Sequence, residues 1–470
     1  MTIVAVPFCL KECLKECRKE HLKADIHAGQ KSATDVSFAE LFSAIAMQPG
    51  ALLLDSCGHP NSRYDFIFWQ PDEVVTARES WPQRLRQLMA QLPDYDGPRE
   101  LPFQGGLAGA WSYDAGRALE QLPERAMADI ALPEITVGLY VRALIRDHAS
   151  NRIWLLAPES EIAHWQAFWQ SVWKAQEAVQ TNATDFALTS AWQSNMSQAD
   201  YLTKFAQVQD YLRAGDCYQI NLAQRFSANY HGDEWAAYQR LRETNQAPYS
   251  GFLRWSGGAI LSHSPERFLH VDEHGKVETK PIKGTRPRDP DPSRDQALAA
   301  ELQTATKDRA ENVMIVDLLR NDLSRVCRPG TVQVPKLFAI ESYAAVHHLV
   351  STVTGELDAT QQPLDLLAAC FPGGSITGAP KVRAMAIIDE LEPHRRSYYC
   401  GSLGYISRHG VSDTNICIRT LVAERGRIHC WAGGGLVVDS EGAAEYQETL
   451  DKVAKILPVL ASTQKDKAPS

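Results

Sequence analysis

The sequence contains 470 residues, of which 44% are hydrophobic and 22% are charged, as in globular chains with one large core or two to three domains. Its formal net charge is −9 and no basic stripe offsets it, which excludes general nucleic-acid binding and means that an anionic substrate needs a local cationic pocket or a metal. The chain shows no apolar run of about 18 residues, its start does not resemble a signal peptide, and its ten cysteines are scattered, so we expect a cytoplasmic protein without a membrane span.

The first thirty residues place Cys9, Cys13, Cys17 and His21 four positions apart, on one stripe of a helix. Zinc sites usually take their ligands from turns with shorter spacings, so we predict an amphipathic helix and assign the stripe no role. The predicted organisation is an extension of unknown role (1–35), an N-terminal region (36–180), a polar linker (181–197), a catalytic region (198–460) and a polar tail (461–470).

Alternating and continuous apolar runs predict strands in the N-terminal region at 51–56, 64–69 and 105–111, followed by a hairpin over 133–157. A tryptophan-rich helix is predicted at 162–178. After the linker we expect helices at 198–214, 234–245, 293–323, 363–370, 381–392 and 441–457. Strands are expected at 217–226, 248–255, 259–262, 336–343 and 347–357, and a meander at 401–407, 412–424 and 427–439.

A candidate nucleophile is Lys283, in the segment PIKGT (281–285). An unperturbed lysine is neutral only about once in 2,500 times at pH 7, and burial or a nearby cation lowers its pKa. Gly284 permits close approach of a ligand and Thr285 offers a hydroxyl, while SPERF (264–268) can return Glu266 to the same neighbourhood. Taken alone, a lysine at a strand end before a glycine turn is the simpler interpretation.

Two predicted helices carry acids at i, i+3 spacing, Asp308 with Glu311 and Glu445 with Glu448, so each pair shares a face. Two facing carboxylates suit Mg²⁺, which keeps several waters and takes oxygen ligands from its substrate. Solvated helix faces are the simpler interpretation, and Glu448 with Lys452 also forms a surface i, i+4 pair.

Gly433, Gly434 and Gly435 fall between two strand-like runs, which predicts a tight loop whose N–H groups could bind a carboxylate. Arg419, at the end of a predicted strand, could clamp a carboxylate with its guanidinium. The segment 371–382 (FPGGSITGAPKV) resembles a phosphate loop but has alanine where the lysine should be, which favours a sharp turn instead. His347 and His348 alternate along a strand, so one points into a core or cleft and the other away.

These motifs together resemble the chorismate-utilising enzymes over about residues 200–457. The matching segments are SPERF (264–268), PIKGT (281–285), AENVMIVDLLRNDLSRV (310–326), HHLVS (347–351), FPGGSITGAPKVRAM (371–385), GYIS (404–407), IRT (418–420), GGGLV (433–437) and EYQETLDK (445–452). The N-terminal half is a looser match, through LLLDS and HPNSRYDF. The resemblance implies an anthranilate-synthase-like α/β (α+β) sandwich of two large antiparallel sheets with helices between and outside, in which both halves of the chain share sheets.

Two positions indicate the reaction within this family. Anthranilate synthases have alanine where this chain has Lys283, and isochorismate and salicylate synthases have a water-activating lysine where it has Gln219. The resemblance therefore implies conversion of chorismate and ammonia to 4-amino-4-deoxychorismate, for p-aminobenzoate and folate synthesis. Anthranilate or isochorismate synthesis is the alternative. The alternative from another class is a non-catalytic regulator that binds tryptophan or chorismate. Such a regulator would not need the catalytic acids and Lys283, so their presence in this chain argues against it.

The resemblance also assigns roles to residues. Lys283 attacks ring C2 of chorismate, Glu266 protonates the departing 4-hydroxyl as general acid, and His348 positions the substrate. Mg²⁺ is held by Glu311 and Glu448, with Asp308 and Glu445 supporting them. The substrate contacts are Gly284, Thr285, Thr377, Tyr405, Arg419, Gly433, Gly434, Gly435 and Lys452.

Two further expectations concern partners and ligands. The chain shows no glutaminase-like cysteine elbow or His-x-Glu pair, so a separate glutamine amidotransferase subunit is expected to supply ammonia. A tryptophan pocket is expected from Ser56, Asn61, Ser62, Arg63, Tyr64, Pro248, Tyr249 and Ser250. Feedback-inhibited anthranilate synthases have glutamate where this chain has Asp55, and this departure leaves both an inhibitory and a structural role open for bound tryptophan.

Overall fold

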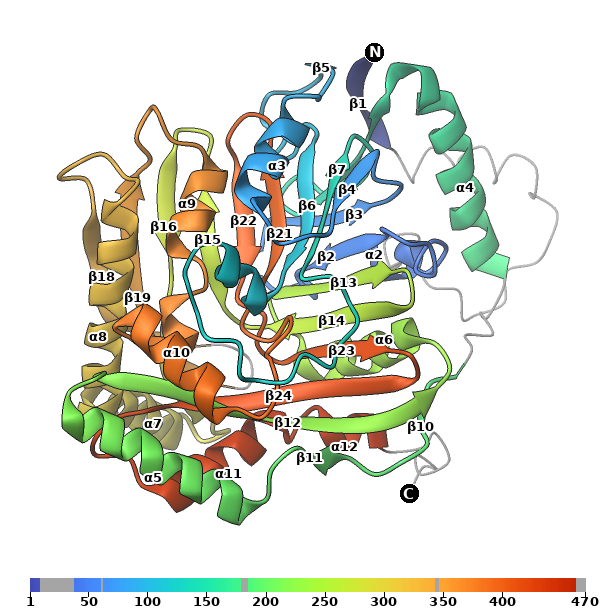
Figure 1. Ribbon diagram of the computed structural model, residues 1–470. Coiled ribbons are helices and arrows are strands. Elements are labelled where there is room, and N and C mark those ends of the chain that lie inside the picture. Colours follow the sequence, from blue (N-terminus) through green and yellow to red (C-terminus); the bar gives the residue numbers. More distant parts are fainter. Residues whose placement is uncertain (9–37, 61, 179–184, 343–345, 462–470) are drawn as a thin grey trace.

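The computed structural model describes residues 1–8, 38–60, 62–178, 185–342 and 346–461 (Figure 1). The stripe of Cys9, Cys13, Cys17 and His21, together with Asn61, part of the predicted linker and residues 462–470, lies outside the described residues. None of the described helices has the length and apolar character needed to cross a membrane.

The larger of two sheets has fourteen strands and contains segments from both halves of the chain (Figure 1). Its order is β10 (Ala187–Leu188), β12 (Gln219–His231), β24 (Arg427–Leu436), β23 (Thr420–Glu424), β14 (Gly258–Ser264), β13 (Tyr249–Trp255), β2 (Leu52–Asp55), β3 (Tyr64–Phe68), β8 (Ala143–Asp147), β9 (Arg152–Pro158), β1 (Thr2–Phe8) and β5 (Asp94–Asp96). The short strands β11 (Gln193–Ser194) and β20 (Gly378–Ala379) also pair with β12. Every pairing is antiparallel except that of β1 with β5.

The smaller sheet has ten strands, all paired antiparallel. Its order is β17 (Ile282–Pro287), β19 (Val346–Glu356), β16 (Lys276–Thr279), β15 (Arg267–Val271), β22 (Ser412–Asn415), β21 (Ser402–Ser407), β6 (Gly106–Trp111), β7 (Ile135–Tyr140) and β4 (Glu73–Val75), with β18 (Gln333–Ser342) also paired to β19. The predicted pair of large antiparallel sheets is confirmed, and both sheets mix strands from before and after residue 198.

Helices surround the sheets, and their ends follow the capping signals of the sequence. Ser197 and Asp200 form a capping box at the start of α5, and Gly215 (φ +81°) ends it. The helices are α2 (Phe38–Phe42), α3 (Trp81–Met89), α4 (Ile162–Ala178), α5 (Gln198–Ala214), α6 (Glu234–Asn245), α7 (Pro292–Thr304), α8 (Thr306–Ser324), α9 (Pro363–Cys370), α10 (Lys381–Leu391), α11 (Gly442–Val453) and α12 (Leu457–Ala461), with short 3₁₀ turns at Tyr113–Ala118, Glu159–Glu161 and Gly374–Ile376.

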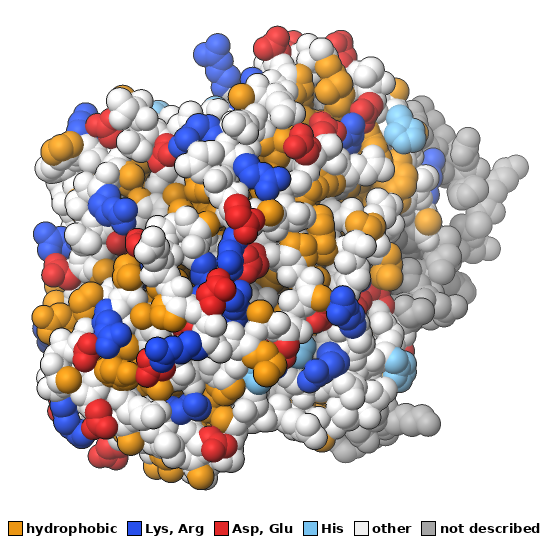
Figure 2. All heavy atoms as spheres, in the orientation of Figure 1, with side chains coloured by type: hydrophobic (Ala, Val, Ile, Leu, Met, Phe, Trp, Pro, Cys, Tyr) orange, Lys and Arg blue, Asp and Glu red, His pale blue; other side chains and the backbone are white. Residues whose placement is uncertain are grey.

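Strand alternation divides the larger sheet between two cores. Leu52 and Phe66 face the core between the two sheets, whereas Leu53 and Ile67 face a second core on the opposite side, under α2, α4, α6 and α12. Both faces of this sheet are therefore buried, which explains the continuous apolar run in β2. On the outer surface, acidic and basic side chains are intermingled over the face drawn in Figure 2.

Two predictions about strands were wrong. Residues 412–424 do not form one strand: β22 belongs to the smaller sheet and β23 to the larger, and the chain crosses between them at 416–419. Arg419 adopts a left-handed φ of +50° there, so it lies beyond a strand end. Residues 133–157 do not form one hairpin either, because β7 joins the smaller sheet and only β8 and β9 pair with each other.

Two further observations concern the predicted linker and the predicted long helix. Part of the predicted linker is ordered, because β10 and β11 add to the edge of β12. The helix predicted over 293–323 is two helices separated at Ala305, whose ψ of 110° breaks the helical path. Because of this break, α8 begins as a new helix and does not continue α7.

Trp169→Ala should lower the free energy of unfolding by about 3–5 kcal/mol. The Trp169 side chain is fully buried on α4, with its ring centroid 5.1 Å from that of Trp69, so truncation leaves a cavity under the larger sheet. Denaturant unfolding measures the change, with the exposed neighbour Gln170→Ala as control. Equal midpoints for the two variants would contradict the packing described here.

Candidate active site

Lys283 lies on β17, where the pairing with β19 is irregular between Ile282 and Thr285. Gly284 has a φ of +78°, and a Cβ there would lie 2.7 Å from Leu302 Cδ1 and 2.8 Å from Asp308 Cγ. Only glycine fits this turn without strain. The turn directs the Lys283 amine away from the sheet to donate a hydrogen bond to the Ser375 carbonyl oxygen, 3.2 Å away.

Glu266 lies between β14 and β15 and is only 5% exposed. Burial raises its pKa to about 7, although the Ser375 hydroxyl and the Lys283 charge both act to lower it. The Ser375 Oγ donates to Glu266 Oε1 at 2.9 Å. Glu266 is therefore a carboxyl group that exchanges its proton near neutral pH, as a general acid must.

His348 lies across from the lysine turn on β19. Its Nδ1 is 2.9 Å from the Thr285 hydroxyl, and burial, with the nearby charge of Arg419, lowers its pKa to about 4, so it is neutral at pH 7. His347 points the other way, toward Ser342 (2.7 Å) and Asp295 (2.9 Å). The alternation expected for the two histidines is confirmed.

Three carboxylates gather where α8 and α11 approach each other. A Cβ on Gly434 would lie 3.0 Å from Glu445 Oε2 and 3.6 Å from Glu448 Oε1. Burial raises the pKa of Glu311, and the charges of Glu445 and Glu448 add to this. The Lys307 ammonium lies 3.0 Å from Glu445 Oε1 and 4.0 Å from Glu311 Oε1.

This donor set fits Mg²⁺ only together with other ligands. Within the described residues, no three His, Cys, Asp or Glu side chains are grouped closely enough to hold a metal ion alone. Mg²⁺ is commonly bound by one or two carboxylates plus waters and substrate oxygens. Glu311, 12% exposed, and Glu448, 48% exposed, present such a pair at the rim of the site.

The three consecutive glycines do not form the predicted loop. Gly433, Gly434 and Gly435 lie within β24 and pair with Ala223, Leu222 and Asn221 of β12. Strand β23 pairs with β24 only at 427–430, so the other edge of β24 is left without that partner at the glycines. The Lys452 ammonium reaches this strand and donates to the Gly433 carbonyl oxygen at 2.7 Å.

Arg419 lies just before β23, at the side where β24 loses its neighbour. Burial lowers the pKa of its guanidinium, and its backbone carbonyl accepts from His263 N–H at 3.1 Å. Its charge contributes to the lowered pKa of His348. Thr377 follows the 3₁₀ turn at 374–376 and is fully buried, and its carbonyl oxygen accepts from Asn221 N–H at 2.8 Å.

Two predicted site residues lie elsewhere. Asp308 does not join the other acids, because it packs under Gly284 and lies 3.5 Å from an Arg286 nitrogen. Tyr405 points into the space between the two sheets, with its ring centroid 4.7 Å from that of Phe66. Side chains alternate between the two faces of a strand, and the position of Tyr405 on β21 places its ring on the face toward that core.

A separate cavity of about 490 Å³ lies between the sheets. Seven of the eight residues predicted for the tryptophan pocket line it, namely Ser56, Ser62, Arg63, Tyr64, Pro248, Tyr249 and Ser250, while Asn61 is outside the described residues. Tyr405 and Arg267 line it as well. Asp55 at its wall is engaged by Arg242 (2.5 Å) and Tyr238 (3.1 Å).

Sequence reasoning missed Ser375 and Lys307. Ser375 contacts both Glu266 and Lys283, yet within its segment the sequence analysis assigned a substrate contact to Thr377 and no role to Ser375. No local spacing relates Ser375 to residues 92 and 109 positions away. Lys307 precedes Glu311 by one helical turn, and this i, i+4 spacing was the signal that could have found it.

Comparison with known proteins identifies the family. The model of chorismate binding enzymes matches residues 50–458. Aminodeoxychorismate synthase component 1 of Klebsiella aerogenes is 50% identical over 443 residues, 90% of this chain and 96% of that protein. The protein of the same name from Escherichia coli (strain K12) is 50% identical over 438 residues, covering 89% and 95%. The crystal structure of anthranilate synthase component I from Streptococcus pneumoniae TIGR4 superposes with a TM-score of 0.75 at 27% identity, covering 94% and 96%.

The chain belongs to the chorismate binding enzyme family. The family predicted from the motifs is confirmed, and so is the two-sheet fold that the resemblance implied.

Gly434→Ala should weaken chorismate binding by roughly 5- to 150-fold, corresponding to about 1–3 kcal/mol of overpacking. The added methyl group would lie beside the Glu445 and Glu448 carboxylates, in the space that opens toward the ligand, while the strand pairing is kept. Isothermal titration calorimetry measures the affinity, and thermal unfolding checks that the fold is retained. An unchanged affinity in a folded variant would contradict this placement of the ligand.

Proposed function

We propose that the chain converts chorismate and ammonia to 4-amino-4-deoxychorismate. The observation that carries the proposal is the arrangement of Lys283 and Glu266, which both contact Ser375, one through its carbonyl oxygen and the other through its hydroxyl. A nucleophile and a general acid are thus held at one point. The two relatives at 50% identity, both named aminodeoxychorismate synthase component 1, support this reaction over anthranilate or isochorismate synthesis.

The reaction proceeds in two displacements at the ring of chorismate. Glu266 donates its proton to the 4-hydroxyl, which leaves as water while the neutral Lys283 amine bonds to C2 and both conjugated ring double bonds shift toward C4. Ammonia then bonds to C4, both double bonds shift back, and the C2–N bond to Lys283 breaks. The lysine regains its amine and the product retains the enolpyruvyl group.

The substrate carboxylates require cationic partners in a chain of net charge −9. In this proposal Arg419 and Lys452 supply them. Lys452 contacts the β24 glycines, where the missing side chains leave room for the ligand. Glu311 and Glu448 would hold Mg²⁺, which neutralises a substrate carboxylate when bound. Glu445 supports that pair and is itself oriented by the Ser440 hydroxyl at 2.7 Å. His348 and Thr285 orient the turn that carries Lys283.

Ammonia is supplied by a separate glutamine amidotransferase subunit in this proposal. The name component 1 carried by the relatives supports a second component. We place the reaction in the cytoplasm, since all seven cysteines in the described part of the chain are free thiols, as expected in a reducing compartment.

The cavity between the sheets is proposed to bind tryptophan as a structural ligand. The rings of Tyr64, Tyr249 and Tyr405 in its wall suit an indole ring. Glu278 and Arg267, also in the wall, have the charges needed to bind the ammonium and carboxylate groups of an amino acid. Asp55 is already paired with Arg242, which supports a structural rather than an inhibitory role for the ligand.

Purified chain mixed with chorismate, Mg²⁺ and ammonium salt should form 4-amino-4-deoxychorismate, identified by mass spectrometry. With ammonia withheld, a protein adduct of the mass of chorismate minus water should map to Lys283, and Lys283→Ala should lower turnover by roughly 10³-fold or more. Lys276→Ala is the matched control, because Lys276 is an exposed lysine on β16 that does not line the cavity between the sheets. Anthranilate or isochorismate as product would overturn the proposed reaction, and normal turnover by Lys283→Ala would overturn the nucleophile role.

The advantage in kcat/KM of wild type over Glu266→Gln should fall about tenfold per pH unit above pH 7, because both enzymes share the dependence on a neutral Lys283 and only wild type has the Glu266 carboxyl. Glu266 acts only when protonated, and burial raises its pKa to about 7, so the active form is present below that pH and is lost as the pH rises through it. Glu266→Gln should lower the rate by about 10²- to 10⁴-fold and remove the dependence on this carboxyl. A profile that is the same for wild type and Glu266→Gln would refute the assignment.

A further inference from the structure

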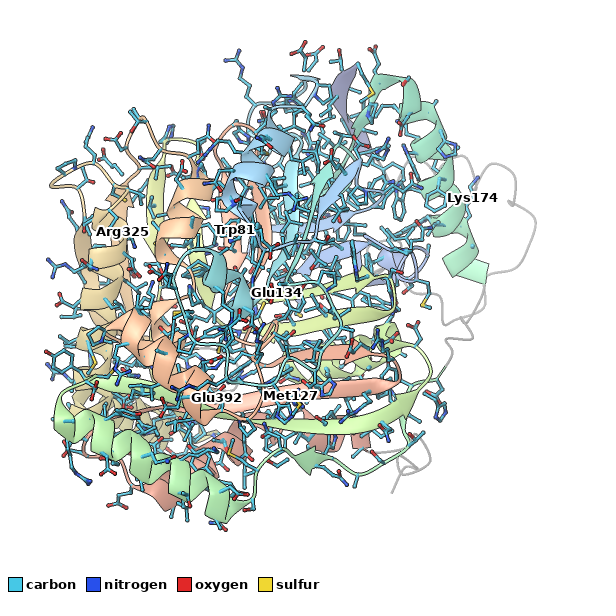
Figure 3. All side chains as sticks on the ribbon, viewed as in Figure 1. Trp81, Met127, Glu134, Lys174, Arg325 and Glu392 are labelled. Atoms are coloured by element: carbon cyan, nitrogen blue, oxygen red, sulfur yellow. The ribbon has the colours of Figure 1, made fainter. Side chains whose placement is uncertain are left out.

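A buried ion pair lies directly behind the candidate active site. Glu392 ends α10 and Arg396 follows it by four residues, with exposed fractions of 5% and 1%. The guanidinium donates from Nε to Glu392 Oε2 at 2.9 Å and from Nη2 to Oε1 at 2.6 Å. Figure 3 shows Glu392 where the end of α10 approaches β12.

The remaining hydrogen bonds of this pair reach two other elements. Arg396 Nη1 donates to the Ile376 carbonyl oxygen at 2.9 Å, and Nη2 donates to that of Asn221 at 3.0 Å. Glu392 Oε1 accepts from Ala223 N–H at 2.9 Å. One ion pair therefore joins α10, the 3₁₀ turn at Gly374–Ile376 and strand β12.

Aromatic rings enclose the guanidinium. Its central carbon lies 4.9 Å from the ring centroid of Tyr113 and 5.7 Å from that of Tyr399. In many proteins the free energy lost by desolvating two buried charges is as large as the free energy gained from their attraction. A net gain in stability therefore does not explain why this pair is buried. A fully bonded buried pair instead fixes the geometry of the groups that it contacts.

The groups fixed here adjoin the reacting residues. Ser375 precedes Ile376, and its hydroxyl and carbonyl oxygen contact Glu266 and Lys283 respectively. Asn221 pairs with Gly435 in the strand that borders the ligand site. A small rotation of the turn would break both contacts of Ser375, because its two polar groups are only a few bonds from the Ile376 carbonyl.

We infer that Glu392 and Arg396 form a positioning pair for the reaction: they hold the turn at 374–376 against β12, and thereby hold Ser375 on Glu266 and Lys283. The inference rests on the proposed function and extends it to residues that contact neither substrate nor reacting atoms. It requires that loss of the pair acts on the rate through Ser375.

Arg396→Lys is the main test, because lysine keeps a charge for Glu392 but cannot make four directed hydrogen bonds. We expect kcat to fall at least about tenfold with KM changed less than about threefold, as for a contact that acts in the transition state. The control is Arg254→Lys, which alters another buried arginine, paired with Asp233 (2.8 Å) and Glu234 (2.5 Å) on α6. It should lower the melting temperature and leave kcat unchanged.

A double-mutant cycle separates positioning from general loss of structure. In the Ser375→Ala background, Arg396→Lys should change kcat less than about twofold, since the contact through which the pair acts is already gone. The inference would be overturned if Arg396→Lys lowered kcat by the same factor in the Ser375→Ala background as in wild type. It would also be overturned if the single variant Arg396→Lys had the kcat of wild type. If Arg396→Lys does not fold, Glu392→Gln carries the same comparisons, because it keeps the side-chain shape and an acceptor for Ala223 N–H. Absence of turnover in wild type itself would instead refute the proposed function.

Discussion

Compensation of carboxylate charge is the constraint on which the site depends. Four carboxyl groups converge on one partly buried space, those of Glu266, Glu311, Glu445 and Glu448. Without nearby cations these carboxylates would repel one another or take up protons. Lys283 lowers the pKa of both Glu266 and Glu311, and Lys307 pairs with Glu445. The acids and lysines therefore form one electrostatic unit, in which each lysine controls the ionisation of more than one acid. The Mg²⁺ proposed at Glu311 and Glu448 would add to this balance at a site for a dianionic substrate.

The topology supplies the space for that unit. The chain leaves the smaller sheet after β22, crosses at 416–419 and enters the larger sheet as β23. Because the crossing ends at Arg419, β23 does not extend beside the β24 glycines, and that edge of β24 is left without β23 as a partner there. A continuous strand over 412–424 would have covered that edge and closed the site. The left-handed φ of Arg419 turns the chain away from the β24 glycines at the residue whose guanidinium is proposed to bind a substrate carboxylate.

Much of this arrangement could be predicted from the sequence, for reasons that differ between residues. Helices with capping signals, such as α5, were located to the residue, and Lys283, Glu266 and His348 came together because long family motifs carry them. What failed depended on contacts between distant segments. Asp308 shares a helix face with Glu311, but the turn at Gly284 packs against it, and Tyr405 was misplaced because a motif gives no information on which side of a strand faces the ligand. The break at Arg419 had no glycine or proline to mark it, and local pattern alone cannot reveal that one strand divides between two sheets.

The candidate active site and the cavity between the sheets share a stretch of backbone. Glu266 and Arg267 are consecutive and point to opposite sides, the first toward Ser375 and Lys283, the second into the cavity between the sheets. Arg267 is held by both oxygens of Asp413, at 2.9 and 3.0 Å, and its guanidinium lies 5.1 Å from the Tyr249 ring centroid. The Glu266 carbonyl oxygen in turn accepts from Ile416 N–H at 3.0 Å. The contacts that shape the cavity therefore also fix the backbone from which the general acid projects, so the cavity contributes to the geometry of the reaction without touching the reacting atoms.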